Sequence, residues 1–228
     1  MANKNRIRSA AFFTSNWVIT LTATLIGVFM ALYLNEWMAS RKLTQQKELA
    51  ATNILAEIAS NQESLEASIG QHTKLLGFVR FFSTHYTEEN ELVVPVDTMQ
   101  RFKSNYPDLI VVTDSTAMGN GVYKYKGEMN IDLQLLHIEF ATIAWETLKN
   151  SGITATYGFE CLMYLENMDK ITREVLQKNK ELMAFLSDKK DSGPKNEQLI
   201  HHLKTQIQYE EGLLEIYAAR DLEFKNCE

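Results

Sequence analysis

The hydrophobic positions near the N-terminus form one block. No charged residue occurs from Phe12 to Leu34, and from Val18 onward this stretch is apolar apart from threonines. A helix can bond threonine hydroxyls to its own carbonyls, so they do not prevent insertion into lipid. Trp17 and Trp37 bracket the block at a helical separation of about 30 Å, the thickness of the hydrocarbon layer, and indoles prefer membrane interfaces. The pattern predicts a transmembrane helix over residues 12–37.

Two other interpretations fit this block less well. One is a buried core helix, and the other is a signal peptide cleaved near the small residues of 38–40. The apolar stretch is longer than a signal-peptide core of about 7–15 residues, and the polar segment 35–37 is a poor approach to a cleavage site. We therefore interpret the block as a retained anchor that precedes a domain over residues 38–228.

After the anchor, apolar residues, with a few polar ones that a helix interface can accommodate, recur in alternating steps of four and three. They are Ala51, Leu55, Ile58, Gln62, Leu65, Ile69, His72, Leu76 and Val79. This spacing predicts a long helix with coiled-coil packing that continues from the anchor. Because a polar residue on such a stripe more often sets register than binds a ligand, we interpret Gln62 and His72 as structural.

The periodicity breaks over residues 83–130, where we expect an irregular insert. Residues 93–96 favour an extended strand, Asp97 is a candidate cap for a short helix, and residues 109–113 have β-branched character. Residues 119–121, Gly-Asn-Gly, are typical of a turn. A small β-hairpin and a pair of short helices both fit this stretch.

Helical periodicity returns in three segments. Asp132 is a candidate N-cap for a helix that ends at residues 150–152. A second helix starts at Thr156, and its stripe comprises Cys161, Leu165, Met168, Thr172, Val175, Asn179, Leu182 and Leu186. A surface turn at residues 187–194 leads to a third, whose predicted buried side comprises Leu199, Leu203, Ile207, Leu213 or Leu214, Tyr217 and Phe224. The last two helices predict an antiparallel hairpin over 156–226. The fold class is therefore mainly all-α, a helical bundle with a small irregular or β element.

The two cysteines, Cys161 and Cys227, lie near the two ends of this hairpin. With the turn centred near Asp191, they are about 8–9 Å apart along the helix axis. A disulfide needs Cα atoms within about 7 Å, which a frayed C-terminus folding back could supply. The alternatives are a bridge, or a buried Cys161 with a loose Cys227.

Charge bears on partners and on topology. A formal net charge of −6 without a basic cluster argues against nucleic-acid binding. The basic residues that flank the anchor nearly balance: Lys4, Arg6 and Arg8 before it, and Arg41, Lys42 and Lys47 after it. The first group sits closer to the membrane on a short tail. The positive-inside rule then favours a cytoplasmic tail over residues 1–11 and an extracytoplasmic domain.

Small residues recur at every fourth position of the anchor, at Ala23, Gly27 and Ala31. Such a stripe lets two membrane helices approach backbone to backbone. We expect a homo-oligomer or a larger membrane complex.

Catalytic, metal and cofactor signals are missing from the sequence. The histidines lack the i, i+4 spacing of a zinc helix. Carboxylate pairs such as Glu63 with Glu66 and Glu210 with Glu211 resemble ordinary charged helix surfaces, and residues 119–121 lack the lysine of a phosphate loop. We therefore expect neither an enzyme nor a bound cofactor or metal.

Two stretches resemble a family of uncharacterised bacterial single-pass membrane proteins. The anchor block 25–37 ends in Asn-Glu-Trp and runs into Arg41-Lys42, similar to the Asn-x-Trp element of this family. Residues 144–152 are similar to its aromatic-x-x-Leu-x-x-Ser-Gly element. The similarity covers residues 12–60 and 140–165, and it implies a location in the bacterial envelope without implying an activity.

Taken together, these patterns predict a non-enzymatic protein of the bacterial inner membrane, with its C-terminal domain in the periplasm. It would act as a structural, scaffold or accessory subunit. The alternatives are a domain that senses small molecules or envelope stress through a membrane partner, and an envelope hydrolase with a polar cleft in residues 83–130.

Overall fold

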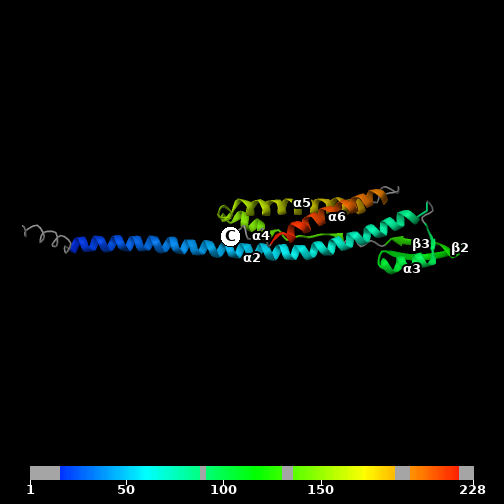
Figure 1. Cartoon of the computed structure of the whole chain (residues 1–228), viewed down its shortest axis with the longest axis horizontal. Helices are drawn as coiled ribbons and strands as arrows, with labels where there is room; N and C mark the ends of the chain where they lie inside the picture. The colour runs from blue at the N-terminus through cyan, green and yellow to red at the C-terminus, as the bar shows by residue number, and fades with distance from the viewer. Residues whose placement is uncertain (1–15, 88–90, 130–135, 188–195, 221–228) are drawn as a thin grey trace, which may run out of the picture. The chain divides into compact units, whose positions relative to one another are not determined.

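The computed structural model describes residues 16–87, 91–129, 136–187 and 196–220 (Figure 1). It divides into two compact units, Met1–Thr52 and Asn53–Glu228. The described residues are mainly α-helical with one small sheet, as the sequence predicts. Each unit is described by itself below.

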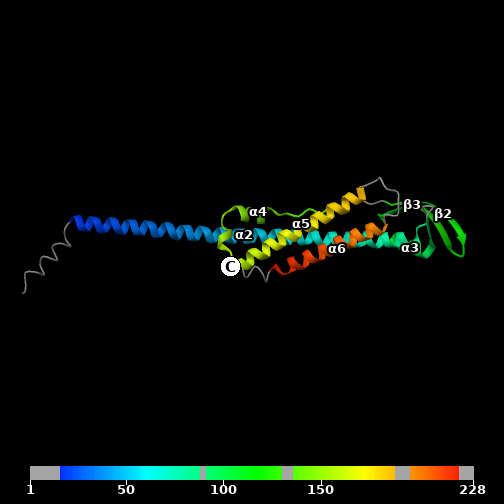
Figure 2. The ribbon, with the colours of Figure 1, turned by 90° about the horizontal axis from the view of Figure 1, so that it is seen from above.

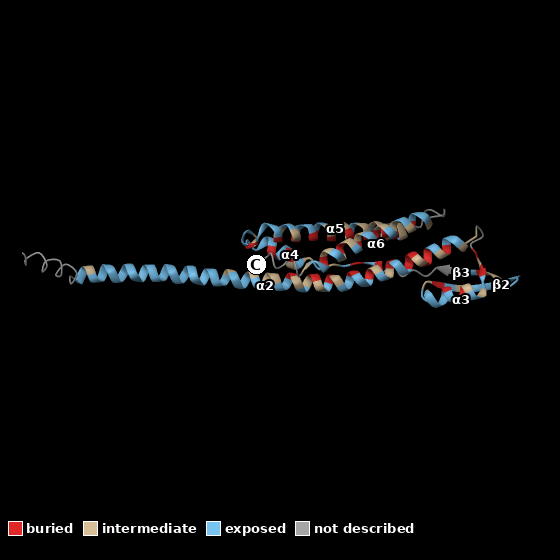
Figure 3. Ribbon diagram, viewed as in Figure 1, coloured by how far each residue is buried: buried red, intermediate tan, exposed pale blue. Residues whose placement is uncertain are grey.

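The described part of the first unit is the beginning of helix α2 (Asn16–His85). Its threonine hydroxyls bond to backbone carbonyls one turn earlier: Thr20 to Asn16 at 2.8 Å, Thr22 to Val18 at 2.9 Å and Thr24 to Thr20 at 2.8 Å. The apolar stretch is long and apolar enough to cross a membrane, and none of it is buried within the chain. Figure 3 accordingly shows this part of α2 almost entirely as exposed.

The second unit is built on the remainder of α2 and on two long helices, α5 (Phe159–Ser187) and α6 (Asn196–Ala218). Helices α5 and α6 pack side by side and run antiparallel (Figure 2). The predicted stripe of α5 is buried from Cys161 to Leu182, and Leu186 at its end is half-buried. The helical hairpin is therefore confirmed for the residues that the structure describes.

The predicted stripe of α2 is only half right. The predicted positions Ile58, Leu65, His72, Leu76 and Val79 are buried, and the other buried positions that alternate with them are Ile54, Asn61, Ser68 and Leu75. In place of Ile54, Asn61 and Ser68 the prediction had Leu55, Gln62 and Ile69, which are half-buried. The less apolar side of the helix turns inward because Asn61 and Ser68 find hydrogen-bond partners there.

The insert is a three-stranded antiparallel sheet with one helix. The strands are β1 (Glu91–Pro95), β2 (Ile110–Gly119) and β3 (Val122–Met129), and they lie in the order β1-β3-β2. Helix α3 (Val96–Asn105) connects β1 to β2 along the chain. The turn between β2 and β3 holds Gly119, Asn120 and Gly121 at φ values of 98°, 53° and 74°. This left-handed backbone favours Gly and Asn, so the predicted hairpin turn is confirmed.

Of the two alternatives for the insert, the β-hairpin is confirmed, and a single short helix precedes it. The predicted cap is wrong: α3 begins at Val96, so the cap position is Pro95, two residues before Asp97, and no side chain caps the helix. A proline at this position fixes φ near the helical value and has no N–H to satisfy.

Aromatic rings join this insert to the end of α2. The Phe78 ring stacks on Phe82 with centroids 5.6 Å apart and on Phe102 of α3 at 5.3 Å. Tyr106 meets Phe78 edge-on at 5.8 Å. The three phenylalanine rings are buried in one apolar core with residues of the sheet, and the half-buried Tyr106 packs against it. This core joins the insert to the end of α2.

The buried carboxylate of Glu91 on β1 makes this sheet sensitive to acid. Hydrogen bonding and charge from Lys124, with help from Lys126, hold its pKa below the ordinary value of 4.5. A lowered folded-state pKa stabilises the fold above pH 4.5, and this contribution is lost as the pH falls. In urea titrations between pH 3 and pH 6, Glu91→Gln is expected to flatten part of the acid-induced loss of stability. An identical slope in both proteins would contradict this expectation.

The helix predicted from Asp132 to Asn150 is wrong over residues 137–142. Asp132 itself lies outside the described residues, and regular helix begins only with α4 (Ile143–Asn150). Its predicted end is confirmed, since Gly152 follows with a φ of 74°. The next helix was expected from Thr156, but a 3-10 turn (Thr154–Thr156) comes first and α5 begins at Phe159.

Candidate functional site

The predicted anchor residues are all exposed on the first part of α2. Trp17 and Trp37 expose 60% and 45% of their surface, and the large apolar side chains between them expose about half or more, except for the half-buried Val18. The small residues Ala23, Gly27 and Ala31 are exposed too, and outside the adjacent backbone of α2 no described atom lies within 4 Å of a Cβ placed at Gly27. An apolar surface of this extent needs lipid or another protein to cover it.

A buried polar cluster joins α2 to α6. Glu210 accepts hydrogen bonds from Ser68 at 2.8 Å and from Gln206 at 2.8 Å, and its carboxylate lies 2.8 Å from His72 Nδ1. His72, Gln206 and Glu210 are wholly inaccessible to solvent. The prediction that Glu210 belongs to a charged surface is therefore wrong, although its neighbour Glu211 is indeed exposed.

This serine, histidine and glutamate do not form a hydrolytic triad. In a triad the histidine bridges serine and acid through its two ring nitrogens. Here both partners face Nδ1, while Nε2 is buried without a hydrogen bond among the described residues. With no access to solvent, the cluster serves to hold two helices in register, which agrees with the structural role predicted for His72.

The spacing of α6 contains the signal that sequence reasoning missed. Its buried residues are Leu199, Leu203, Gln206, Glu210, Leu213 and Tyr217, again in steps of four and three. The predicted set kept only apolar residues and chose Ile207, which is half-buried. If the buried side of α6 is assigned from the steps of four and three alone, without regard to polarity, it includes Gln206 and Glu210.

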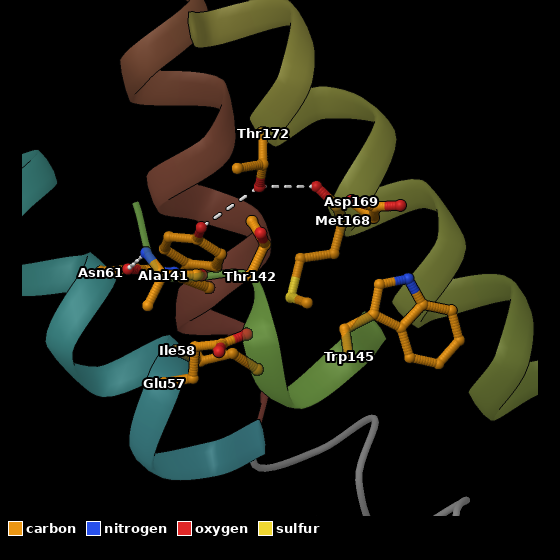
Figure 4. A pocket seen from close by; sticks show the side chains of 10 residues that line it. Glu57, Ile58, Asn61, Ala141, Thr142, Trp145, Met168, Asp169 and Thr172 are labelled. Atoms are coloured by element: carbon orange, nitrogen blue, oxygen red, sulfur yellow. Dashed lines mark hydrogen bonds between the residues drawn. The ribbon is translucent and has the colours of Figure 1, made fainter. Parts of the chain in front are cut away.

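Two buried asparagines hold residues 136–142, which precede α4, against the helices. Asn61 on α2 donates to the carbonyl of Ala141 at 2.7 Å and accepts from the amide of Ala141 at 2.9 Å (Figure 4). Asn179 on α5 donates to the carbonyl of Leu136 at 2.8 Å and accepts from the amide of Ile138 at 3.4 Å. The side-chain amides thus supply the partners that a neighbouring strand would otherwise give.

Removing one of these asparagine side chains should destabilise the fold measurably. Asn179→Ala leaves a buried carbonyl and a buried amide without their partner, which costs about 1–3 kcal/mol of unfolding free energy. The exposed neighbour in Lys180→Ala should change stability by less than about 0.5 kcal/mol. Urea denaturation measures both variants, and hydrogen exchange should quicken at the amide of Ile138. Equal stabilities for the two variants would show that the hydrogen bonds of Asn179 do not stabilise the fold.

The cavity beside Asn61 is too small for a metabolite. It lies between α2, α4, α5 and α6 and is lined by polar and apolar side chains that include Glu57, Trp145, Thr172 and Tyr217 (Figure 4). Its free space is about 10 Å³, which is about what one water molecule needs. Burial raises the pKa of Tyr217, whose hydroxyl lies 3.2 Å from that of Thr172. This site therefore favours internal packing over ligand sensing.

The predicted disulfide concerns Cys161, which is fully buried at the start of α5. Cys227 lies outside the described residues, so the bridge stays a prediction. In full-length protein purified without reductant, a maleimide added after denaturation should label no cysteine before reduction and two after it. Labelling of both cysteines without reduction would show that the bridge is missing.

Comparison of the chain with protein-family models, with curated proteins and with solved structures finds no match.

Proposed function

We propose that this chain is a non-enzymatic, single-pass protein of the bacterial inner membrane. It belongs to the uncharacterised anchor-containing family that its sequence resembles, and it works as a structural, scaffold or accessory subunit. The observation that supports this most is the exposed apolar beginning of α2, bracketed by Trp17 and Trp37. Lipid covers these side chains at no cost to the helix, whose backbone bonds are satisfied within the helix itself.

The proposed orientation places residues 1–11 in the cytoplasm and the second unit in the periplasm. It rests on the three basic residues close before the span and on the positive-inside rule. Alkaline phosphatase and green fluorescent protein, each fused after Glu228, test it separately. Phosphatase activity without fluorescence supports the proposed orientation, and bright fluorescence would show that the second unit lies in the cytoplasm.

Protein contacts are the proposed activity of the second unit. Its polar clusters are turned inward, while Phe159 and Met163 expose large apolar side chains one helical turn apart on α5. Such a pair suits a packing surface for another helix. The cavity beside Asn61, in contrast, leaves room for about one water molecule.

Purification in mild detergent tests the assembly. The full-length chain, tagged after Glu228, should elute as a homo-oligomer or with partner subunits, and Phe159→Ser/Met163→Ser should weaken that association. The matched control is Glu160→Ser/Glu166→Ser, which changes two nearby polar positions. A lone monomer at native expression level would contradict the scaffold role.

A further inference from the structure

A cation stacks on an aromatic ring where the apolar part of α2 ends. The guanidinium carbon of Arg41 lies 4.2 Å from the centre of the Trp37 ring. The two residues are one helical turn apart, and both are exposed. The stacked pair therefore presents its free edges outward from the helix.

The two nearest carboxylates along the chain are poorly placed to neutralise Arg41. Glu36 precedes it by five positions, about 140° around the helix, and Glu48 follows it by seven, about 10 Å along the axis. Lys42 lies next to Arg41, about 1.5 Å further along the axis, and is also exposed. This level of the helix thus holds two positive charges beside an indole.

The stacked arginine keeps its hydrogen-bonding capacity. Stacking uses the face of the guanidinium, whereas its five N–H donors lie in the plane and point outward. Two parallel N–H donors of the guanidinium match two oxygens of a phosphate group. The ammonium of the adjacent Lys42 adds electrostatic attraction that does not depend on a particular hydrogen-bond geometry. Indole rings prefer the depth of the lipid headgroups, where phosphodiesters are found.

We propose that Trp37, Arg41 and Lys42 form a binding site for the phosphodiester of an anionic phospholipid. This inference rests on the proposed function, because it requires α2 to cross the bilayer. An anionic headgroup fits better than a zwitterionic one, whose own ammonium group competes for the phosphate and repels Lys42. A basic residue near an anionic surface contributes about a fivefold preference.

Quenching of Trp37 fluorescence by brominated lipids tests the site. The full-length Trp17→Phe chain is reconstituted in phosphatidylcholine vesicles that contain either brominated phosphatidylglycerol or brominated phosphatidylcholine at equal mole fractions. The signal of buried Trp145 is measured in Trp17→Phe/Trp37→Phe and subtracted. We expect phosphatidylglycerol to compete for the site about fivefold better than phosphatidylcholine.

Two matched double variants assign the preference to the basic pair. Arg41→Gln/Lys42→Gln should bring the ratio of the two lipids close to one, whereas Arg101→Gln/Lys103→Gln, on α3 in the second unit, should leave it unchanged. Equal quenching by the two lipids in the unmodified site would overturn the inference and leave the membrane span intact. A preference that persists in Arg41→Gln/Lys42→Gln would overturn it too. No quenching by either lipid would overturn the span as well.

Discussion

Glu210→Ala is expected to lower the free energy of unfolding by several kcal/mol, about 1–3 kcal/mol for each buried polar group that loses its hydrogen-bond partner. His72, Ser68 and Gln206 all direct polar atoms at this carboxylate, and none of the three can turn to water. Urea denaturation of the full-length protein in detergent, followed by circular dichroism, measures the loss.

Two further variants distinguish the effect of the buried cluster from that of an exposed carboxylate. Glu211→Ala removes the exposed neighbouring carboxylate and should change stability by less than about 0.5 kcal/mol. His72→Leu/Glu210→Met replaces both partners by apolar groups of similar size. It should recover only the part of the loss that comes from His72, because Ser68 and Gln206 still lose their acceptor. If Glu210→Ala unfolds at the same urea concentration as Glu211→Ala, the cluster does not stabilise the contact between α2 and α6.

The second large effect is expected in the anchor. Val28→Arg/Ala31→Arg places two charges near the middle of the apolar stretch of α2, and each arginine disfavours insertion by about 2.5–3.5 kcal/mol. The summed penalty of about 5–7 kcal/mol should move most of the protein out of the membrane fraction that resists carbonate extraction.

Val28→Leu/Ala31→Leu is the matched control, because it alters the same positions and keeps them apolar. This variant should remain in the membrane fraction together with the unmodified chain. If the unmodified chain is recovered from the aqueous fraction with residues 18–34 protected from protease, the anchor and the proposed location are both wrong.

The elements that the sequence predicts well are those that depend on neighbours in the chain. The apolar stretch of α2, the stripe of α5 and the Gly119-Asn120-Gly121 turn each follow from periodicity or backbone preference within a few residues. The predicted anchor residues were likewise found exposed on one helix. Local pattern is sufficient here because the helix and the turn satisfy their own backbone bonds.

The features that the sequence predicts badly depend on partners far along the chain. The helix expected through residues 137–142 gives way to irregular backbone, to which Asn61 and Asn179 bond from two other helices. Glu210 is buried because Ser68 and His72, about 140 positions earlier, meet its carboxylate.

The amino-acid sequence by itself thus determined the fold class, the long helix with its apolar beginning, and the helical hairpin. Only the tertiary structure decided which polar residues turn inward and which side of α2 faces the core. A polar side chain can be buried only where its hydrogen bonds are replaced, and packing of distant segments alone supplies those replacements.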